Sequence, residues 1–168
     1  MILLPALLLA ASSPAAPCPD RTLNAKALCA EMKVECSFVT QDWDGIIPAL
    51  QNGNFDALVA SMSITPEREE QIAFTNKYYQ TPPAIAVPKD SDITEATAEA
   101  LAGKAIGAQT STTHARAAES YFPDADVRQY PTAEEYKLDI ESGRVDAVVD
   151  DVVDRKSTRL NSSHVVIS

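Results

Sequence analysis

The segment from Ser61 to Arg68 gathers side chains that could hold a carboxylate. It reads Ser-Met-Ser-Ile-Thr-Pro-Glu-Arg, in which Thr65 is placed to cap a helix beginning at Pro66. The guanidinium of Arg68 could donate two parallel hydrogen bonds to a carboxylate, and Ser63 could add a hydroxyl bond. The segment is therefore a candidate anion site, with an ordinary capped helix and a solvated arginine as the alternative.

Other polar residues follow predicted strands or begin predicted helices. The turn from Gln109 to Thr113 includes Thr112 and offers hydroxyls and backbone amides to an anion, although helix N-caps use the same residue types. Asp151 follows a strand and could accept hydrogen bonds from an ammonium group; a solvated aspartate is the alternative. Trp43, the only tryptophan, could stack on a ligand side chain or pack in the core.

Motifs for bond-making chemistry are missing from the sequence. It contains no Gly-rich phosphate loop, no His-Glu-x-x-His and no nucleophile elbow. The pattern suggests no Ser or Cys partner for His114, and we expect this residue on the exterior of a helix. No set of Cys and His residues has the spacing of a metal site. The sequence therefore predicts reversible binding without cofactor or metal, and not an enzyme.

The elements that must position these residues alternate between helix and strand. Strands are predicted near 34–40, 55–60, 104–108, 127 and 145–149. Helices are predicted near 25–33, 42–50, 97–102, 112–121 and 132–142, and another begins at Pro66. A proline-rich extended segment at 79–92 separates the two series and is a plausible crossing between lobes. Strands that alternate with helices indicate parallel sheets covered on both faces, so the predicted class is α/β.

An internal repeat suggests that two lobes share one plan. Residues 50–61, Leu-Gln-Asn-Gly-Asn-Phe-Asp-Ala-Leu-Val-Ala-Ser, match residues 140–151, Ile-Glu-Ser-Gly-Arg-Val-Asp-Ala-Val-Val-Asp-Asp. Each copy is a helix closed by glycine, followed by a strand that opens with Asp-Ala. The overlay places Ser61 on Asp151, just past strand ends of the kind where α/β sheets bind ligands. We therefore expect a cleft lined from both lobes; a convenient helix-to-strand connection is the alternative.

The charge and the first residues restrict partners and location. A formal net charge of −10 argues against nucleic acid, which requires a basic face, and leans weakly toward cationic ligands. Residues 1–17 carry an apolar run followed by small residues and prolines, typical of a secretory signal peptide and too short to span a bilayer. We expect an exported, periplasmic protein. In that oxidising compartment Cys29 and Cys36 could close a short loop, with two buried free thiols as the alternative.

These residues resemble the family 3 bacterial solute-binding proteins, in particular those for lysine, arginine, ornithine, histidine and opines. The resemblance runs from 25 to 153 and depends on three segments, 27–36 (Ala-Leu-Cys-Ala-Glu-Met-Lys-Val-Glu-Cys), 41–50 (Gln-Asp-Trp-Asp-Gly-Ile-Ile-Pro-Ala-Leu) and 61–68. It implies a two-lobed periplasmic binding protein type II fold, with 22–84 in lobe I and 85–153 in lobe II. It also implies a Cys29–Cys36 disulfide.

The resemblance assigns a role to each candidate residue. Trp43 matches an aromatic that stacks on the ligand side chain. The positions that match contacts with the α-amino and α-carboxylate groups are Ser61, Ser63 and Arg68 in the first lobe and Thr112 and Asp151 in the second. Among these, Asp151 matches the acid that receives the α-amino group. The implied function is capture of a polar, basic amino acid by a monomer that docks on the permease of an ABC importer.

The sequence departs from the family pattern at both ends. Members begin with a strand and an aromatic-rich ligand segment, whereas residues 18–24 here lead directly into the first helix. We therefore expect the first strand, and the acid that selects a basic side chain, to be absent. Residues 154–168 resemble a translated sequencing adapter and are expected to be an artefact. Two other functions remain open: a cyclohexadienyl dehydratase, which the same family includes, and the ligand-binding domain of a membrane sensor.

Overall fold

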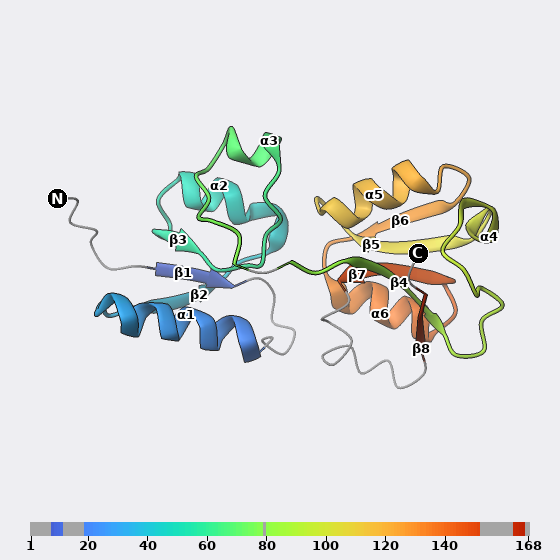
Figure 1. Cartoon of the computed structure of the whole chain (residues 1–168), viewed down its shortest axis with the longest axis horizontal. Helices are drawn as coiled ribbons and strands as arrows, with labels where there is room; N and C mark the ends of the chain where they lie inside the picture. Colours follow the sequence, from blue (N-terminus) through green and yellow to red (C-terminus); the bar gives the residue numbers. More distant parts are fainter. Residues whose placement is uncertain (1–7, 12–18, 79, 152–162, 167–168) are drawn as a thin grey trace. The chain divides into compact units, whose positions relative to one another are not determined.

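The structure is a computed structural model that describes residues 8–11, 19–78, 80–151 and 163–166 (Figure 1). The chain divides into two compact units, Met1–Lys77 and Tyr78–Ser168. Among the residues described, no helix combines the length and apolar composition needed to span a bilayer.

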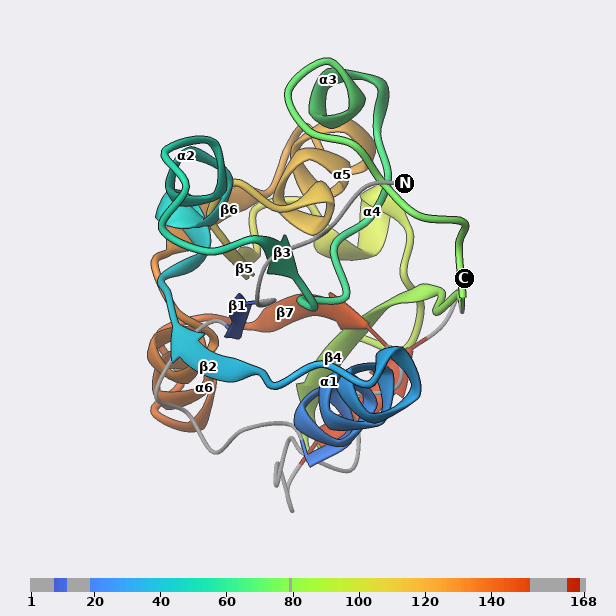
Figure 2. The same ribbon diagram turned by 90° about the vertical axis from the view of Figure 1, so that its left-hand side faces the viewer.

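The first unit contains a three-stranded parallel sheet with the strand order β2-β1-β3. Its elements are β1 (Leu8–Ala11), α1 (Pro19–Met32), β2 (Ser37–Thr40), η1 (Trp43–Gly45), α2 (Ile46–Gln51), β3 (Ala57–Leu58) and α3 (Pro66–Glu69). Helices α1 and α2 cover opposite faces of this sheet (Figure 1, Figure 2). Around α2 the core consists of Ile46, Ala49, Phe55 and Ala60.

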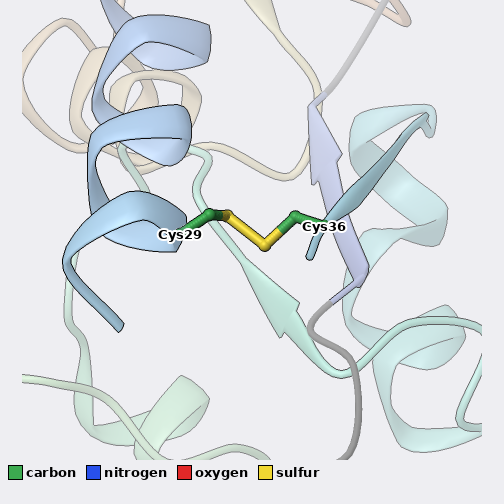
Figure 3. Close-up of a disulfide and its surroundings, with 2 residues drawn as sticks. All are labelled: Cys29 and Cys36. Carbon is green, nitrogen blue, oxygen red and sulfur yellow. A yellow bond between two sulfur atoms is a disulfide. The ribbon is translucent and has the colours of Figure 1, made fainter. Parts of the chain in front are cut away.

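A disulfide joins Cys29 of α1 to Cys36, which directly precedes β2 (Figure 3). The two Cα atoms are 6.3 Å apart, and Cys29 packs with Ala25 in a small buried cluster. This pairing confirms the disulfide implied by the family resemblance. By restricting the unfolded chain, a loop of this length stabilises the fold by about 2–3 kcal/mol.

Strand β1 lies in the middle of the first sheet. Leu8 pairs with Ser37 of β2, and Leu9 pairs with Ala57 of β3. These residues are predicted to belong to a signal peptide, and the first strand is predicted to be absent. The pairing of β1 shows that the second prediction is wrong. A short apolar run is typical both of a leader and of a strand buried in a parallel sheet, so the pattern does not separate the two. Export through a signal peptide stays a prediction; residues 1–7 and 12–17 of that segment lie outside the described residues.

The second unit contains a five-stranded sheet with the order β6-β5-β7-β4-β8. Its elements are β4 (Pro83–Pro88), α4 (Ala98–Leu101), β5 (Ala105–Gln109), α5 (Thr113–Tyr121), β6 (Asp126–Tyr130), α6 (Ala133–Glu141), β7 (Ala147–Asp151) and β8 (Ser163–Val166). Strand β5 runs parallel to β6 and β7, whereas β4 runs antiparallel to β7 and β8. The proline-rich segment, interpreted as a crossing between lobes, therefore supplies a strand of this sheet.

Two residue ranges bear on the predicted boundaries of the second lobe. Residues 163–166, within the range expected to be an artefact, pair with β4 as β8. Residues 152–162 lie outside the described residues. The predicted artefact and the predicted lobe boundaries stay predictions.

Helices α5 and α6 cover opposite faces of the second sheet (Figure 1, Figure 2). On the α5 face, Ala147 and Val149 of β7 pack with Ala118. On the α6 face, Val148 packs with Tyr136. This alternation along β7 follows from the pleat of a strand, in which successive side chains point to opposite faces. Because of the same alternation, the side chains of the two aspartates that end β7 point to opposite faces of the sheet.

Candidate ligand-binding residues in the two units

Arg68 is a buried cation in the first unit, with only 7 % of its surface exposed. Its Nη1 donates a hydrogen bond of 2.8 Å to the carbonyl oxygen of Ser63. Its Cζ atom lies over the ring of Trp43, 5.7 Å from the ring centroid. A carbonyl and an aromatic face both attract a guanidinium, so these contacts fix the orientation of the Arg68 side chain.

The backbone before Arg68 follows the predicted cap. The hydroxyl of Thr65 accepts a hydrogen bond of 3.4 Å from the backbone N–H of Arg68, and Pro66 occupies the first turn of α3. Ser61 has a φ of 54°, in the left-handed region that residues other than glycine rarely adopt. Such conformations cost energy and cluster at functional sites, which makes the loop from Ser61 to Thr65 a candidate for one.

Trp43 combines the two interpretations given for it. It is half-buried and packs against the core around Ile46 and Phe55. The Arg68 guanidinium also lies over the face of its ring. The structure thus brings Trp43, Ser63 and Arg68 together, as a set of binding residues requires, and places half-buried Ser61 in the same loop.

Thr112 in the second unit is the N-cap of α5 and is 7 % exposed. Its hydroxyl donates a bond of 2.6 Å to the carbonyl of Gln109 and accepts a bond of 3.1 Å from the N–H of Ala115. The single hydroxyl proton is therefore engaged within the turn. The neighbouring Ser111 has a φ of 57°, a second left-handed residue next to a predicted contact.

Asp151 at the end of β7 lies against His114 in the first turn of α5. The His114 Nε2 atom is 3.2 Å from Oδ1 of Asp151, and the two side chains are 17 % and 32 % exposed. The expectation that His114 lies on a helix exterior is therefore wrong. The reason is topological: β5 and β7 are parallel neighbours, so the helix that follows β5 begins at the edge where β7 ends.

Asp150 is held on the opposite face of the sheet. Its Oδ2 accepts a hydrogen bond of 2.5 Å from the hydroxyl of Tyr136 in α6, and its Oδ1 accepts one of 2.8 Å from the backbone N–H of Asp151. Sequence reasoning missed both side-chain pairs. The pleat of β7 could have indicated that Asp150 faces α6 and Asp151 faces α5.

A separate charged cluster closes the turn after α6. Asp139 accepts hydrogen bonds from Arg144 and from the Tyr130 hydroxyl, and these bonds lower the pKa of the Asp139 carboxyl. Burial, followed by the bond to Asp139, raises the pKa of Tyr130. This cluster connects elements of the second unit and includes none of the predicted ligand residues. In the part of the chain that the structure describes, no group of three or more His, Cys, Asp or Glu side chains could hold a metal ion.

Comparison with known proteins identifies relatives of both units. The model of the bacterial extracellular solute-binding proteins, family 3, matches residues 24–161. The octopine-binding periplasmic protein of Rhizobium meliloti is 40 % identical over 147 residues, which cover 74 % of this chain and 50 % of that protein. The L-arginine-binding protein of Pseudomonas aeruginosa is 41 % identical over 129 residues, covering 76 % of this chain and 49 % of that protein. The chain thus spans about half the length of these curated relatives.

A solved structure shares the fold. The crystal structure of an ancestral amino acid-binding protein, described as a precursor of cyclohexadienyl dehydratase, matches with a TM-score of 0.87 and 31 % identity. The match covers 96 % of this chain and 77 % of that one. The predicted class, α/β units of the periplasmic binding protein type II fold, is confirmed.

Proposed function

Because the chain belongs to the bacterial extracellular solute-binding proteins of family 3, we propose that it binds a polar, basic amino acid for import by an ABC transporter. The observation that carries this proposal is the buried guanidinium of Arg68, oriented by Ser63 and Trp43. The planar guanidinium of arginine can donate two parallel hydrogen bonds to a carboxylate, so a ligand carboxylate is a suitable partner for Arg68.

The carboxylate of the ligand is the first group to be accommodated. In this proposal it accepts two hydrogen bonds from Arg68, while the hydroxyls of Ser61 and Ser63 add further bonds. Thr112 contributes through the amide-rich N-terminus of α5, because its hydroxyl proton already serves Gln109.

The ammonium group of the ligand requires an acceptor with negative charge. Asp151 supplies one at the end of β7, and its partial burial strengthens a charge-assisted hydrogen bond relative to one in water. Trp43 supplies a ring for the side chain of the ligand. A net charge of −10, together with relatives named for octopine and arginine, supports a basic side chain.

We also propose a location and a partner. Relatives described as periplasmic support export to the periplasm, and family membership supports docking of a monomer on a membrane permease. The binding is reversible and uses neither cofactor nor metal. Calorimetry with permease subunits in detergent would test the docking step separately from ligand capture.

Titration calorimetry of the 168-residue chain tests the proposed capture directly. The ligands are L-arginine, L-lysine, L-ornithine, L-histidine and octopine, and we expect micromolar affinity for at least one, equivalent to about 8 kcal/mol. Arg68→Ala should remove about 2–5 kcal/mol, because it deletes a desolvated charge partner. Arg68→Lys should recover part of the loss, since lysine keeps the charge without the planar fork.

Arg128→Ala is the matched control for the loss of a guanidinium. Arg128 is an exposed arginine that bonds Asp126 and the carbonyl of Arg144. Its removal should leave affinity unchanged. Equal affinities of the unaltered chain and Arg68→Ala would remove Arg68 from the site, and with it the proposed carboxylate contact.

The enzymatic alternative has its own assay. The solved relative described as a precursor of cyclohexadienyl dehydratase is an amino acid-binding protein, which supports binding over dehydration. We expect no product when the chain is incubated with prephenate. Dehydration that depends on Asp151 or His114 would replace the proposal of capture by one of catalysis.

A further inference from the structure

The His114–Asp151 pair joins two elements that are distant in sequence. The residues are 37 positions apart and meet through Nε2 and Oδ1 at 3.2 Å. Both side chains are partly shielded from water, so the hydrogen bond between them competes less with solvent than a surface pair does. A contact of this kind restricts how the Asp151 carboxylate can rotate.

The two aspartates that end β7 are each held by a different helix. Tyr136 of α6 donates to Asp150, which also accepts the backbone N–H of Asp151. His114 of α5 contacts Asp151. The same sheet edge thus carries two carboxylates with separate partners, and the one on the α5 side is the proposed ammonium acceptor.

We propose that His114 is a positioning residue that orients the Asp151 carboxylate for the ammonium group of the bound amino acid. This inference rests on the proposed function and deepens it. An imidazole with hydrogen on Nε2 donates to Oδ1 and fixes the plane of the carboxylate. Each carboxylate oxygen accepts more than one hydrogen bond, so the ammonium can bind the carboxylate while His114 holds it. Pre-orientation reduces the ordering cost of binding.

Substitutions at position 114 separate this role from a general contribution to folding. His114→Ala should weaken L-arginine binding about tenfold, the effect of losing roughly one hydrogen bond to a charged group. His114→Gln should recover affinity to within about threefold, because the glutamine amide reaches about as far as Nε2 and can donate to Oδ1. Thermal unfolding of each variant, followed by circular dichroism, confirms that it folds.

The dependence on Asp151 is the decisive readout. In an Asp151→Asn background, His114→Ala should add no further loss, because the two changes act on one interaction. With 5-guanidinopentanoate, which is arginine without its α-ammonium, His114→Ala should leave affinity unchanged. Glu119→Ala is the control, since Glu119 lies on the same helix, is exposed and bonds Gln129.

The outcomes distinguish this inference from the proposed function. Equal losses in His114→Ala and His114→Gln, or a loss that persists with 5-guanidinopentanoate or in Asp151→Asn, would show that His114 acts through the fold and overturn the inference. If Asp151→Asn abolishes binding while His114→Ala does not change it, the inference fails and the proposed function stands. If Asp151→Asn binds L-arginine as tightly as the unaltered chain, the proposed ammonium contact fails, and the positioning role fails with it.

Discussion

The two copies of the repeat, 50–61 and 140–151, have the same backbone design at their helix ends. In the first, the N–H of Asn54 bonds the carbonyl of Ala49 at 3.0 Å, and that of Gly53 bonds Leu50 at 3.0 Å. In the second, the corresponding bonds run from Arg144 to Asp139 at 2.8 Å and from Gly143 to Ile140 at 3.2 Å. Both are Schellman motifs, which require a left-handed residue that glycine provides. The predicted correspondence of the two units is thus confirmed at the level of individual hydrogen bonds.

The correspondence continues into the strands and ends where the sheets differ. Ala57 pairs with Leu9 in the first sheet, as Ala147 pairs with Ile106 in the second. However, β3 spans Ala57–Leu58, whereas β7 extends to Asp151. Strand β4 pairs with β7 on its other edge and keeps the last residues of β7 extended.

This difference in length changes the chemistry at the end of each strand. In the first copy the chain leaves the sheet early and passes through left-handed Ser61 toward Arg68. In the second copy the extended strand presents Asp151 to His114. One plan therefore places hydroxyls and a cation after the strand of the first unit, and a carboxylate at the end of the strand of the second.

Truncation of the buried side chain two positions after each glycine should produce the largest difference in stability between the two copies. Phe55 and Val145 are equivalent in the overlay and are 5 % and 1 % exposed. Phe55→Ala should cost about 3–5 kcal/mol and Val145→Ala about 2 kcal/mol, because a larger cavity forms in the first unit. Urea unfolding followed by the fluorescence of Trp43, the only tryptophan, reports on the first unit. Equal shifts of that transition in the two variants would mean that the units do not unfold separately.

The disulfide should stabilise one copy and not the other. Replacing Cys29 and Cys36 together by serine should lower the free energy of unfolding of the first unit by about 2–3 kcal/mol. The second unit contains no cysteine, so its protection against hydrogen exchange should not change. Cys18→Ser is the control, and a comparable loss of stability in that variant would contradict a specific role for the Cys29–Cys36 bond.

The two glycines should respond to substitution alike. Gly53 and Gly143 have φ values of 72° and 71°, and an added Cβ would meet no atom within 4 Å at either. The cost of alanine is therefore a backbone cost of about 1 kcal/mol in each unit. Gly53→Asn and Gly143→Asn should cost less, since asparagine tolerates the left-handed region. Unequal losses, measured by hydrogen exchange in each unit, would show that the helix ends are less alike than their hydrogen bonds.

The sequence was sufficient for features that depend on local rules. Thr65 caps α3, and Gly53 and Gly143 end α2 and α6, because capping and left-handed residues act over a few positions. The prediction of the candidate binding residues depended more on the internal repeat and on the family resemblance. Neither signal could show that the Arg68 guanidinium lies over the Trp43 ring, since that contact depends on tertiary packing.

Features that depend on neighbouring strands were harder to predict. The extended, proline-rich segment predicted as a crossing also supplies β4, with Pro83 and Pro88 at its first and last positions, where a strand tolerates proline. The local pattern predicts a helix exterior for His114, because it cannot indicate a partner that lies 37 residues away on a neighbouring strand. The order of strands in the sheet, which the hydrophobic pattern does not contain, decided both cases.

The smallest expected difference between the copies is in their response to acid. The second copy has Asp139 bonded to Arg144 where the first has Ala49 and Asn54. The bonds from Arg144 and Tyr130 hold the pKa of Asp139 below its usual value. The stabilisation is therefore present above the unfolded-state pKa of about 4 and is lost as pH falls through the lower folded-state pKa. Asp139→Asn should flatten the acid side of the stability profile of the second unit, measured by hydrogen exchange from pH about 5 to 2.

The control for this acid response is Asp92→Asn. Asp92 is an exposed aspartate whose bond with Lys104 also lowers its pKa, but it lies outside the repeat. A surface pair of this kind contributes little to stability, so Asp92→Asn should leave the profile close to that of the unaltered chain. If both variants flatten the profile equally, the acid response belongs to the general charge of the unit and not to the helix end that distinguishes the second copy.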